Sequence, residues 1–128
     1  MKYYMSKRVH SHFDVTVQRV LEELKKEGFG VLSEIDVSQT LKNKINVEIP
    51  RYKILGACHP QSAYQALQAE EKIGLLLPCN VIVQDKGENE TEVSAIDPIV
   101  SMKSVENPSL EKLASEVKGR LQRVIEAL

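Results

Sequence analysis

The fold is indicated first by the stretch YKILGACHP (residues 52–60), in which a mostly apolar segment runs directly into a helix start. Its first part, residues 52–58, is apolar enough to be buried on both faces, as central β-strands are. His59-Pro60 follows, and proline is favoured in the first turn of a helix because its missing N–H would have no partner there. The pattern therefore predicts a central strand that leads at once into a helix over residues 60–70.

Upstream of this stretch, the sequence predicts a strand, a helix and a second strand. Residues 1–10 mix tyrosines and aliphatic side chains with charges, and residues 29–36 alternate between the two kinds, so we expect both segments to be extended. Between them, apolar residues recur at helical intervals from Phe13 to Leu24. Ser11 and Asp14 have the spacing of a capping box, and Gly28 is a suitable helix stop. A short helix is expected over residues 36–44, with Asp36 or Ser38 as its cap.

Downstream, the sequence predicts a hairpin followed by helices. Residues 74–83 are mostly apolar and residues 92–96 alternate, so we expect two strands joined by a polar turn over residues 85–91. Asp97-Pro98 and Asn107-Pro108 each place a capping side chain before a proline, which indicates two further helix starts. The last helix carries both Val124 and Ile125, which suggests more apolar surface than one core needs.

These segments predict an α+β fold. The 128 residues are enough for one domain, and no linker-like stretch divides them, so we expect a single domain over residues 1–128. We therefore expect a two-layer arrangement, a mainly antiparallel sheet with helices packed on one face.

Charge and cysteine content exclude several classes of protein. There are 17 Lys and Arg residues against 18 Asp and Glu, whereas a nucleic-acid binder or a polybasic membrane anchor has a basic excess, so neither partner is expected. Two cysteines are too few for a disulfide-stapled secreted domain. No apolar run approaches the roughly 18 residues of a membrane helix, and the first residues lack the apolar segment of a signal peptide. We therefore expect a cytoplasmic protein with reduced thiols.

Polar or reactive side chains stand at the ends of the apolar runs, and five of them are candidate ligand-binding residues: Cys58, His59, Cys79, Asn80 and Asp97. Cys58 and His59 precede a predicted helix, whose N-terminal N–H groups attract anions and lower the pKa of a thiol. Cys79 and Asn80 follow a proline within an apolar run, which indicates a strand end or a bulge. Each residue also has a structural explanation, as a buried thiol, a helix cap or, for Asn80, a partner of local backbone groups. The two thiols with His59 or Asp97 would offer metal ligands, although their spacing gives this no direct support.

Several segments together resemble a small bacterial and archaeal family that is catalogued as domain of unknown function 302. They are YKILGACHP (52–60), GLLLPCNV (74–81), GFGV (28–31), EID (34–36) and AIDP (95–98). The resemblance extends from about residue 3 to residue 128. It implies a compact α+β fold with an antiparallel sheet, a cytoplasmic setting and a homodimer, and it carries no known reaction. The family commonly has asparagine where this chain has His59.

Three functions remain open. The first is a homodimer that binds a small anionic ligand where strand ends meet helix N-termini, which we prefer because no complete catalytic signature is present. The second is a thiol- or metal-dependent enzyme or redox sensor that uses Cys58 and Cys79. The third is a structural interaction module whose last helix mediates assembly through Val124 and Ile125.

Overall fold

The computed structural model describes residues 2–128 and contains a five-stranded sheet. Its strands are β1 (Tyr4–Val9), β2 (Gly30–Asp36), β3 (Tyr52–Cys58), β4 (Cys79–Gly87) and β5 (Glu90–Ile96), in the spatial order β1-β5-β4-β3-β2. All four neighbouring pairs are antiparallel. The apolar segment at residues 52–58 lies inside the sheet between β2 and β4, as predicted.

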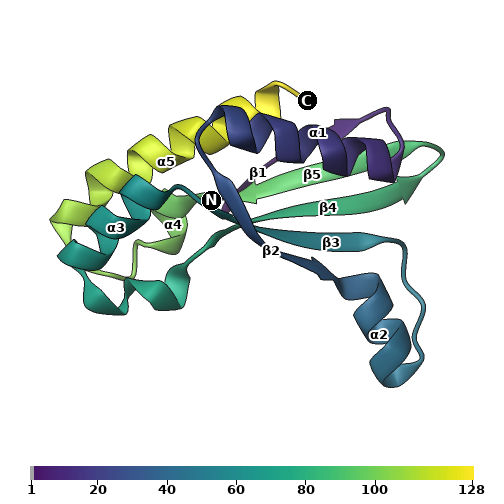
Figure 1. Cartoon of the computed structure of the whole chain (residues 1–128), viewed down its shortest axis with the longest axis horizontal. Coiled ribbons are helices and arrows are strands. Elements are labelled where there is room, and N and C mark those ends of the chain that lie inside the picture. Colours follow the sequence, from purple (N-terminus) through teal and green to yellow (C-terminus); the bar gives the residue numbers. More distant parts are fainter. Residues whose placement is uncertain (1) are drawn as a thin grey trace.

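Two helices cover one face of the sheet (Figure 1). These are α1 (Phe13–Lys26) and α5 (Pro108–Glu126), and both start near the predicted positions. Their apolar faces pack on the buried side chains of the inner strands and form the main core, which includes Val20, Leu24, Leu55, Val81, Val83, Val93, Leu121 and Val124. The structure therefore confirms the α+β class, the antiparallel sheet and the helices on one face.

A smaller cluster lies at one end of the sheet. There α3 (Pro60–Ala69), the short 3-10 helix η1 (Glu71–Leu76) and α4 (Pro98–Ser101) gather beside the first half of α5. Ala66, Ile73 and Leu110 are its buried residues. This end of the molecule holds most of the predicted functional residues.

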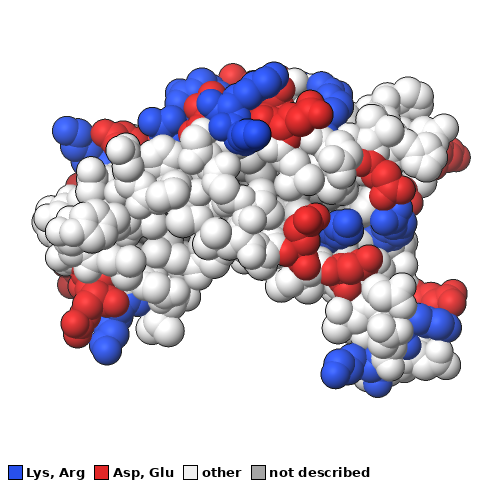
Figure 2. All heavy atoms as spheres, viewed as in Figure 1, with Lys and Arg blue, Asp and Glu red and all other residues white. Residues whose placement is uncertain are grey.

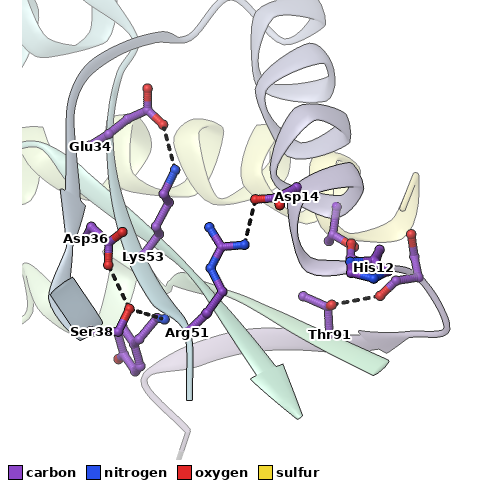
Figure 3. Close-up of polar contacts among 11 residues, drawn as sticks. His12, Asp14, Glu34, Asp36, Ser38, Arg51, Lys53 and Thr91 are labelled. Carbon is purple, nitrogen blue, oxygen red and sulfur yellow. Dashed lines mark hydrogen bonds and ion pairs between the residues drawn. The ribbon is translucent and has the colours of Figure 1, made fainter. Parts of the chain in front are cut away.

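Helix α2 (Val37–Ile45) projects away from the body of the molecule (Figure 1). Asp36 is its N-cap and accepts hydrogen bonds from the Gln39 N–H at 2.9 Å and the Ser38 hydroxyl at 2.7 Å. The Ser38 hydroxyl oxygen in turn accepts the N–H of Tyr52 at 3.4 Å, which ties the helix to β3 (Figure 3). These bonds fix the base of α2, but no residue of the helix is buried.

The predicted capping box at the start of α1 does not form. His12 is the N-cap and makes no side-chain capping bond. The Ser11 carbonyl accepts a hydrogen bond from the buried Thr91 hydroxyl at 2.8 Å, and Asp14 pairs with Arg51 at 2.8 Å (Figure 3). Both residues of the predicted capping box therefore take part in tertiary contacts and do not cap α1.

The hairpin is confirmed, but its turn is shorter than predicted. Glu88 and Asn89 both have positive φ angles, 52° and 59°, and they join β4 to β5 directly. Positive φ at both central residues is the mark of a type I′ turn, whose twist matches that of the strands. The apolar run at residues 74–83 is not one strand, because η1 ends at Leu76 and β4 begins only at Cys79, after Pro78.

The predicted surplus of apolar surface on α5 is also wrong. Val124 and Ile125 are 1% and 5% exposed. Because α5 lies against α1 and against the strands β1 and β5, both neighbouring side chains are covered within one chain. Assembly through these two residues is therefore excluded.

Candidate functional site

The junction between β3 and α3 fixes the position of His59. This residue is the N-cap of α3, and its Nδ1 accepts a hydrogen bond from the Ser62 N–H at 3.4 Å and lies 2.8 Å from the Ser62 hydroxyl. Because Nδ1 accepts, the neutral ring carries its proton on Nε2. Pro60 occupies the first turn of the helix, as predicted. His59 therefore has a structural task as a helix cap.

The surroundings of the His59 ring favour its neutral form. The ring meets Phe29 edge to face, with centroids 5.7 Å apart. A Cβ at Gly28 would lie 3.1 Å from the ring, and Gly28 has a φ of +84°, so glycine is required there. Burial, followed by the positive charge of Arg120, lowers the pKa of His59 below its usual 6.5, against a smaller opposing effect of Glu116. The imidazole is therefore uncharged at neutral pH.

The two cysteines are free thiols in different environments. Cys79 is the first residue of β4, pairs with Ala57 of β3 and is 7% exposed. Burial raises the pKa of the Cys79 thiol to about 11, with a smaller contribution from Cys58. Cys79 is thus protonated at neutral pH, whereas Cys58 is only partly buried.

Both thiols and His59 line one small recess. It has a volume of about 40 Å³ and lies between the sheet end and helices α3, α4 and α5. The rest of its wall is almost wholly apolar and includes Phe29, Ala66, Leu77, Pro98, Met102, Leu113, Ala114 and Val117. A water molecule occupies about 30 Å³ of liquid, so the recess accepts a group of one or two carbon atoms rather than a whole metabolite.

A larger groove lies beside α4 and the segment that follows it. Its volume is about 820 Å³, within the roughly 300–1,000 Å³ of typical ligand sites. Apolar side chains of the segment from α4 to α5 line part of it, among them Val100, Val105 and Leu110. Charged side chains from three places in the sequence also line it: Lys2, Lys103, Glu106, Glu111 and Lys118.

Asp97 lines this groove as the N-cap of α4. Its Oδ1 accepts the Ile99 N–H at 2.9 Å, and its Oδ2 lies 2.9 Å from Nζ of Lys118 on α5. The carboxylate belongs to a residue that is only 6% exposed, so the ion pair compensates a buried charge. The predicted capping role of Asp97 is confirmed, and its charge is already paired.

The structure brings four of the five predicted residues to one end of the molecule. Met102 and Ala114 line both the recess and the groove, so the two cavities are neighbours. Cys58, His59 and Cys79 line the first, and Asp97 lines the second.

Asn80 is not part of this arrangement. Consecutive side chains of a strand point to opposite faces of the sheet, and Cys79 takes the buried face. Asn80 is exposed on the other face, beside Tyr52, Ile82 and Gln84. The sequence alone does not show which of the adjacent residues Cys79 and Asn80 faces the core. The register of β4 in the sheet decides this.

The cavity residues that were not predicted include Met102, Ala114 and Lys118. Met102 follows a four-residue helix, and the other two lie on α5. Ala114 and Lys118 are four residues apart, so they share one face of α5. This spacing is the signal in the sequence that could have grouped them. The contact between Lys118 and Asp97 depends on how α5 packs.

Within residues 2–128 the structure holds neither a cluster of metal ligands nor a helix suited to a membrane. Within that range, no three His, Cys, Asp or Glu side chains are grouped so that they could hold a metal ion. No helix of the same range has the length and apolar character needed to cross a bilayer.

Comparison with known proteins identifies the family. The model of the family described as "Domain of unknown function DUF302" matches residues 5–128. The chain belongs to the DUF302 family. It is also similar to a solved structure, the crystal structure of an uncharacterized conserved DUF302 protein from Bacillus stearothermophilus, with 27% sequence identity, a TM-score of 0.91 and 98% of each chain covered. A comparison with curated proteins gives no match. The resemblance seen in residues 28–36, 52–60, 74–81 and 95–98 is thereby confirmed.

Proposed function

We propose that this DUF302 protein is a non-catalytic binding domain whose ligand is a small anionic molecule with an apolar end. The observation that carries the proposal is the pair of neighbouring cavities that share Met102 and Ala114. The groove is large enough for the body of a metabolite, and the recess beside it takes a small apolar group. Methionine is flexible, so the side chain of Met102 can move to join the two spaces.

The anionic character is inferred from the lysines of the groove. Lys118 already pairs with Asp97, so Lys2 and Lys103 are the cations that an anionic group would meet, in a groove that Glu106 and Glu111 also line. Neither Lys2 nor Lys103 forms an ion pair within residues 2–128. A carboxylate or phosphate beside an ammonium group gains a charge-assisted hydrogen bond.

Binding is favoured over catalysis by the state of the reactive groups. A general base needs a free lone pair near the substrate, but Nδ1 of His59 is used by Ser62. A nucleophilic cysteine needs a lowered pKa, but burial raises that of Cys79. The alternative of a thiol-dependent enzyme or redox sensor rests on the fact that Cys58 and Cys79 line the same recess.

The test is a thermal-shift and calorimetric comparison of straight-chain carboxylates, from butanoate to decanoate, with the amines of equal length. We expect the carboxylates to raise the melting temperature and the amines to leave it unchanged. Lys103→Glu should weaken carboxylate binding at least 10-fold, while Lys112→Glu, an exposed change on α5 outside the groove, should not. Equal effects of amines and carboxylates, or no binding of either, would contradict the proposal.

We further propose that the protein is a cytoplasmic homodimer. Free thiols in both cysteines fit a reducing compartment. Large apolar side chains remain exposed on the single chain, including Leu32, Ile35, Ile45 and Leu75. Light scattering coupled to size exclusion tests the assembly, and a monomer at all concentrations would refute it. A dimer that binds none of the carboxylates would contradict the ligand proposal and leave the assembly proposal intact.

A further inference from the structure

One end of the groove beside α4 is basic. Nζ of Lys118 lies 2.9 Å from Oδ2 of Asp97, and both residues line the groove. The Asp97 N–H donates to the carbonyl of Tyr3 at 2.8 Å, which places the preceding residue, Lys2, at the same end. Two ammonium groups against one carboxylate leave an excess of positive charge. We call this part, defined by Lys2, Asp97 and Lys118, the basic end.

The part of the groove where α5 begins is acidic. Glu106 precedes Asn107, the N-cap of α5, and Glu111 lies in the first turn of the helix. Both glutamates are exposed and line the groove. The helix dipole favours an acidic residue in the first turn, but Glu106 lies outside the helix. Even with Lys103 of the same segment included, negative charge is in excess. We call Glu106 and Glu111 the acidic end.

Elsewhere on the surface, charges of opposite sign mostly lie side by side. On the face that Figure 2 shows, most Asp and Glu side chains lie next to a Lys or Arg side chain. Glu106 and Glu111 form no ion pair within residues 2–128. Their carboxylates can therefore accept hydrogen bonds from a cationic group of a ligand.

Helix α5 sets the distance between the two ends. Glu111, Ala114 and Lys118 follow one another at intervals of three and four residues, so they share the face of α5 that lines the groove. At about 1.5 Å per residue, Glu111 and Lys118 are about 10 Å apart along the helix axis. Three residues of extended polypeptide span about the same length.

The small recess opens from the groove between the two ends. Ala114, which lines both cavities, lies between Glu111 and Lys118 on α5. With its volume of about 40 Å³, the recess accepts a group of one or two carbon atoms. A ligand that follows α5 therefore meets an acidic end, a small apolar branch point and a basic end in that order.

We propose that the groove binds an extended peptide of about three residues, with its ammonium group at the acidic end, its carboxylate at the basic end and a small central side chain in the recess. The inference rests on the proposed function, since it keeps the carboxylate and the apolar group and adds the ammonium group. A short peptide matches this order of features because its backbone separates two opposite charges and carries a branch between them. The reverse direction would place like charges together.

Calorimetry with the peptide Gly-Ala-Gly and its capped forms tests the two charges. N-acetylation removes the ammonium group, and C-amidation removes the carboxylate. We expect each cap to weaken binding by about 5-fold or more, because each removes a charge-assisted hydrogen bond. Gly-Gly-Gly lacks only the central methyl group and should bind about 3-fold more weakly. Equal affinities for free and capped peptides would overturn the proposal.

Variants assign each charge of the peptide to its end of the groove. Glu106→Gln combined with Glu111→Gln should remove the difference between the free and the N-acetylated peptide and keep the effect of C-amidation. Lys2→Gln should reduce only the effect of C-amidation. Glu116→Gln changes an exposed residue of α5 outside the groove and should leave both differences unchanged. All four replaced side chains lie outside the core, so the variants should fold, and circular dichroism verifies this.

The length of the peptide gives a second test. The dipeptide Gly-Ala spans only about 7 Å and cannot reach both ends, so we expect it to bind about 5-fold or more weakly than Gly-Ala-Gly. Equal affinity of the two would refute the spacing set by α5.

The outcomes separate this inference from the proposed function. Straight-chain carboxylates that bind while Gly-Ala-Gly does not would overturn the peptide and leave the proposed function intact. A groove that binds neither would overturn both.

Discussion

Replacing Asp97 separates the two tasks that its carboxylate performs. Asparagine keeps an oxygen that accepts the Ile99 N–H but places an amide against the ammonium of Lys118. Asp97→Asn therefore removes the ion pair and keeps the helix cap, whereas Asp97→Ala removes both. The comparison shows whether the carboxylate of Asp97, a candidate ligand-binding group, is needed for the stability of the fold.

The magnitude follows from the burial of the pair. The side chain of Asp97 is 8% exposed and that of Lys118 is 35% exposed. Exposed ion pairs contribute about 0–1 kcal/mol, and breaking a buried pair costs about 3–5 kcal/mol. Because water still reaches Lys118, we expect Asp97→Asn to cost about 2 kcal/mol. Asp97→Ala also loses the cap, which adds about 1 kcal/mol.

Urea denaturation at neutral pH measures both costs, and a double-mutant cycle with Lys118→Met isolates the pair. We expect a coupling free energy of about 1–2 kcal/mol between Asp97 and Lys118. Lys112→Met, an exposed change on the same helix, is the control and should alter stability by less than about 0.5 kcal/mol. A coupling below about 0.5 kcal/mol would show that the ion pair does not stabilise the fold and that the reasoning from burial is wrong.

Three further predictions concern the neighbouring recess and strand. Because Cys79 is buried and its pKa is about 11, iodoacetamide at pH 7.5 should modify Cys58 and leave Cys79 unmodified in the folded protein. Peptide mass spectrometry measures this, and rapid modification of Cys79 would contradict its burial. The pKa of His59 is lower in the folded protein than its usual 6.5, so the unfolded chain binds the extra proton first and stability falls as pH drops through about 6.5. His59→Asn keeps a capping oxygen and should lose less stability between pH 7.5 and 5.5 than the wild type, and equal losses in urea denaturation would disprove this. Gly56→Ala should cost about 1–3 kcal/mol because its Cβ would clash with Oγ of Ser33 and lie 2.9 Å from Cγ of Pro78. Adding Ser33→Gly should restore part of that loss, and an unchanged melting temperature for Gly56→Ala would refute the close contact.

Much of the fold follows from local pattern. The prolines after His59, Asp97 and Asn107 begin α3, α4 and α5, because a capping side chain and a fixed φ angle act within a few residues. The alternation of residues 92–96 likewise produces β5. Where a long-range contact competes with a local one, prediction fails. Helix α1 begins one residue later than predicted, with His12 as its N-cap, while the Ser11 carbonyl accepts from Thr91 and the Asp14 carboxylate pairs with Arg51.

The candidate site shows the same division. The sequence by itself determined that Cys58, His59, Cys79 and Asp97 stand at the ends of strands and the starts of helices, since these positions depend on short-range propensity. Only the tertiary structure decided that α5 carries Lys118 to Asp97 and closes the recess over both thiols. It also placed Asn80 on the sheet face opposite α1 and α5, because adjacent side chains of a strand point to opposite faces and only the register in the sheet decides which of them is buried.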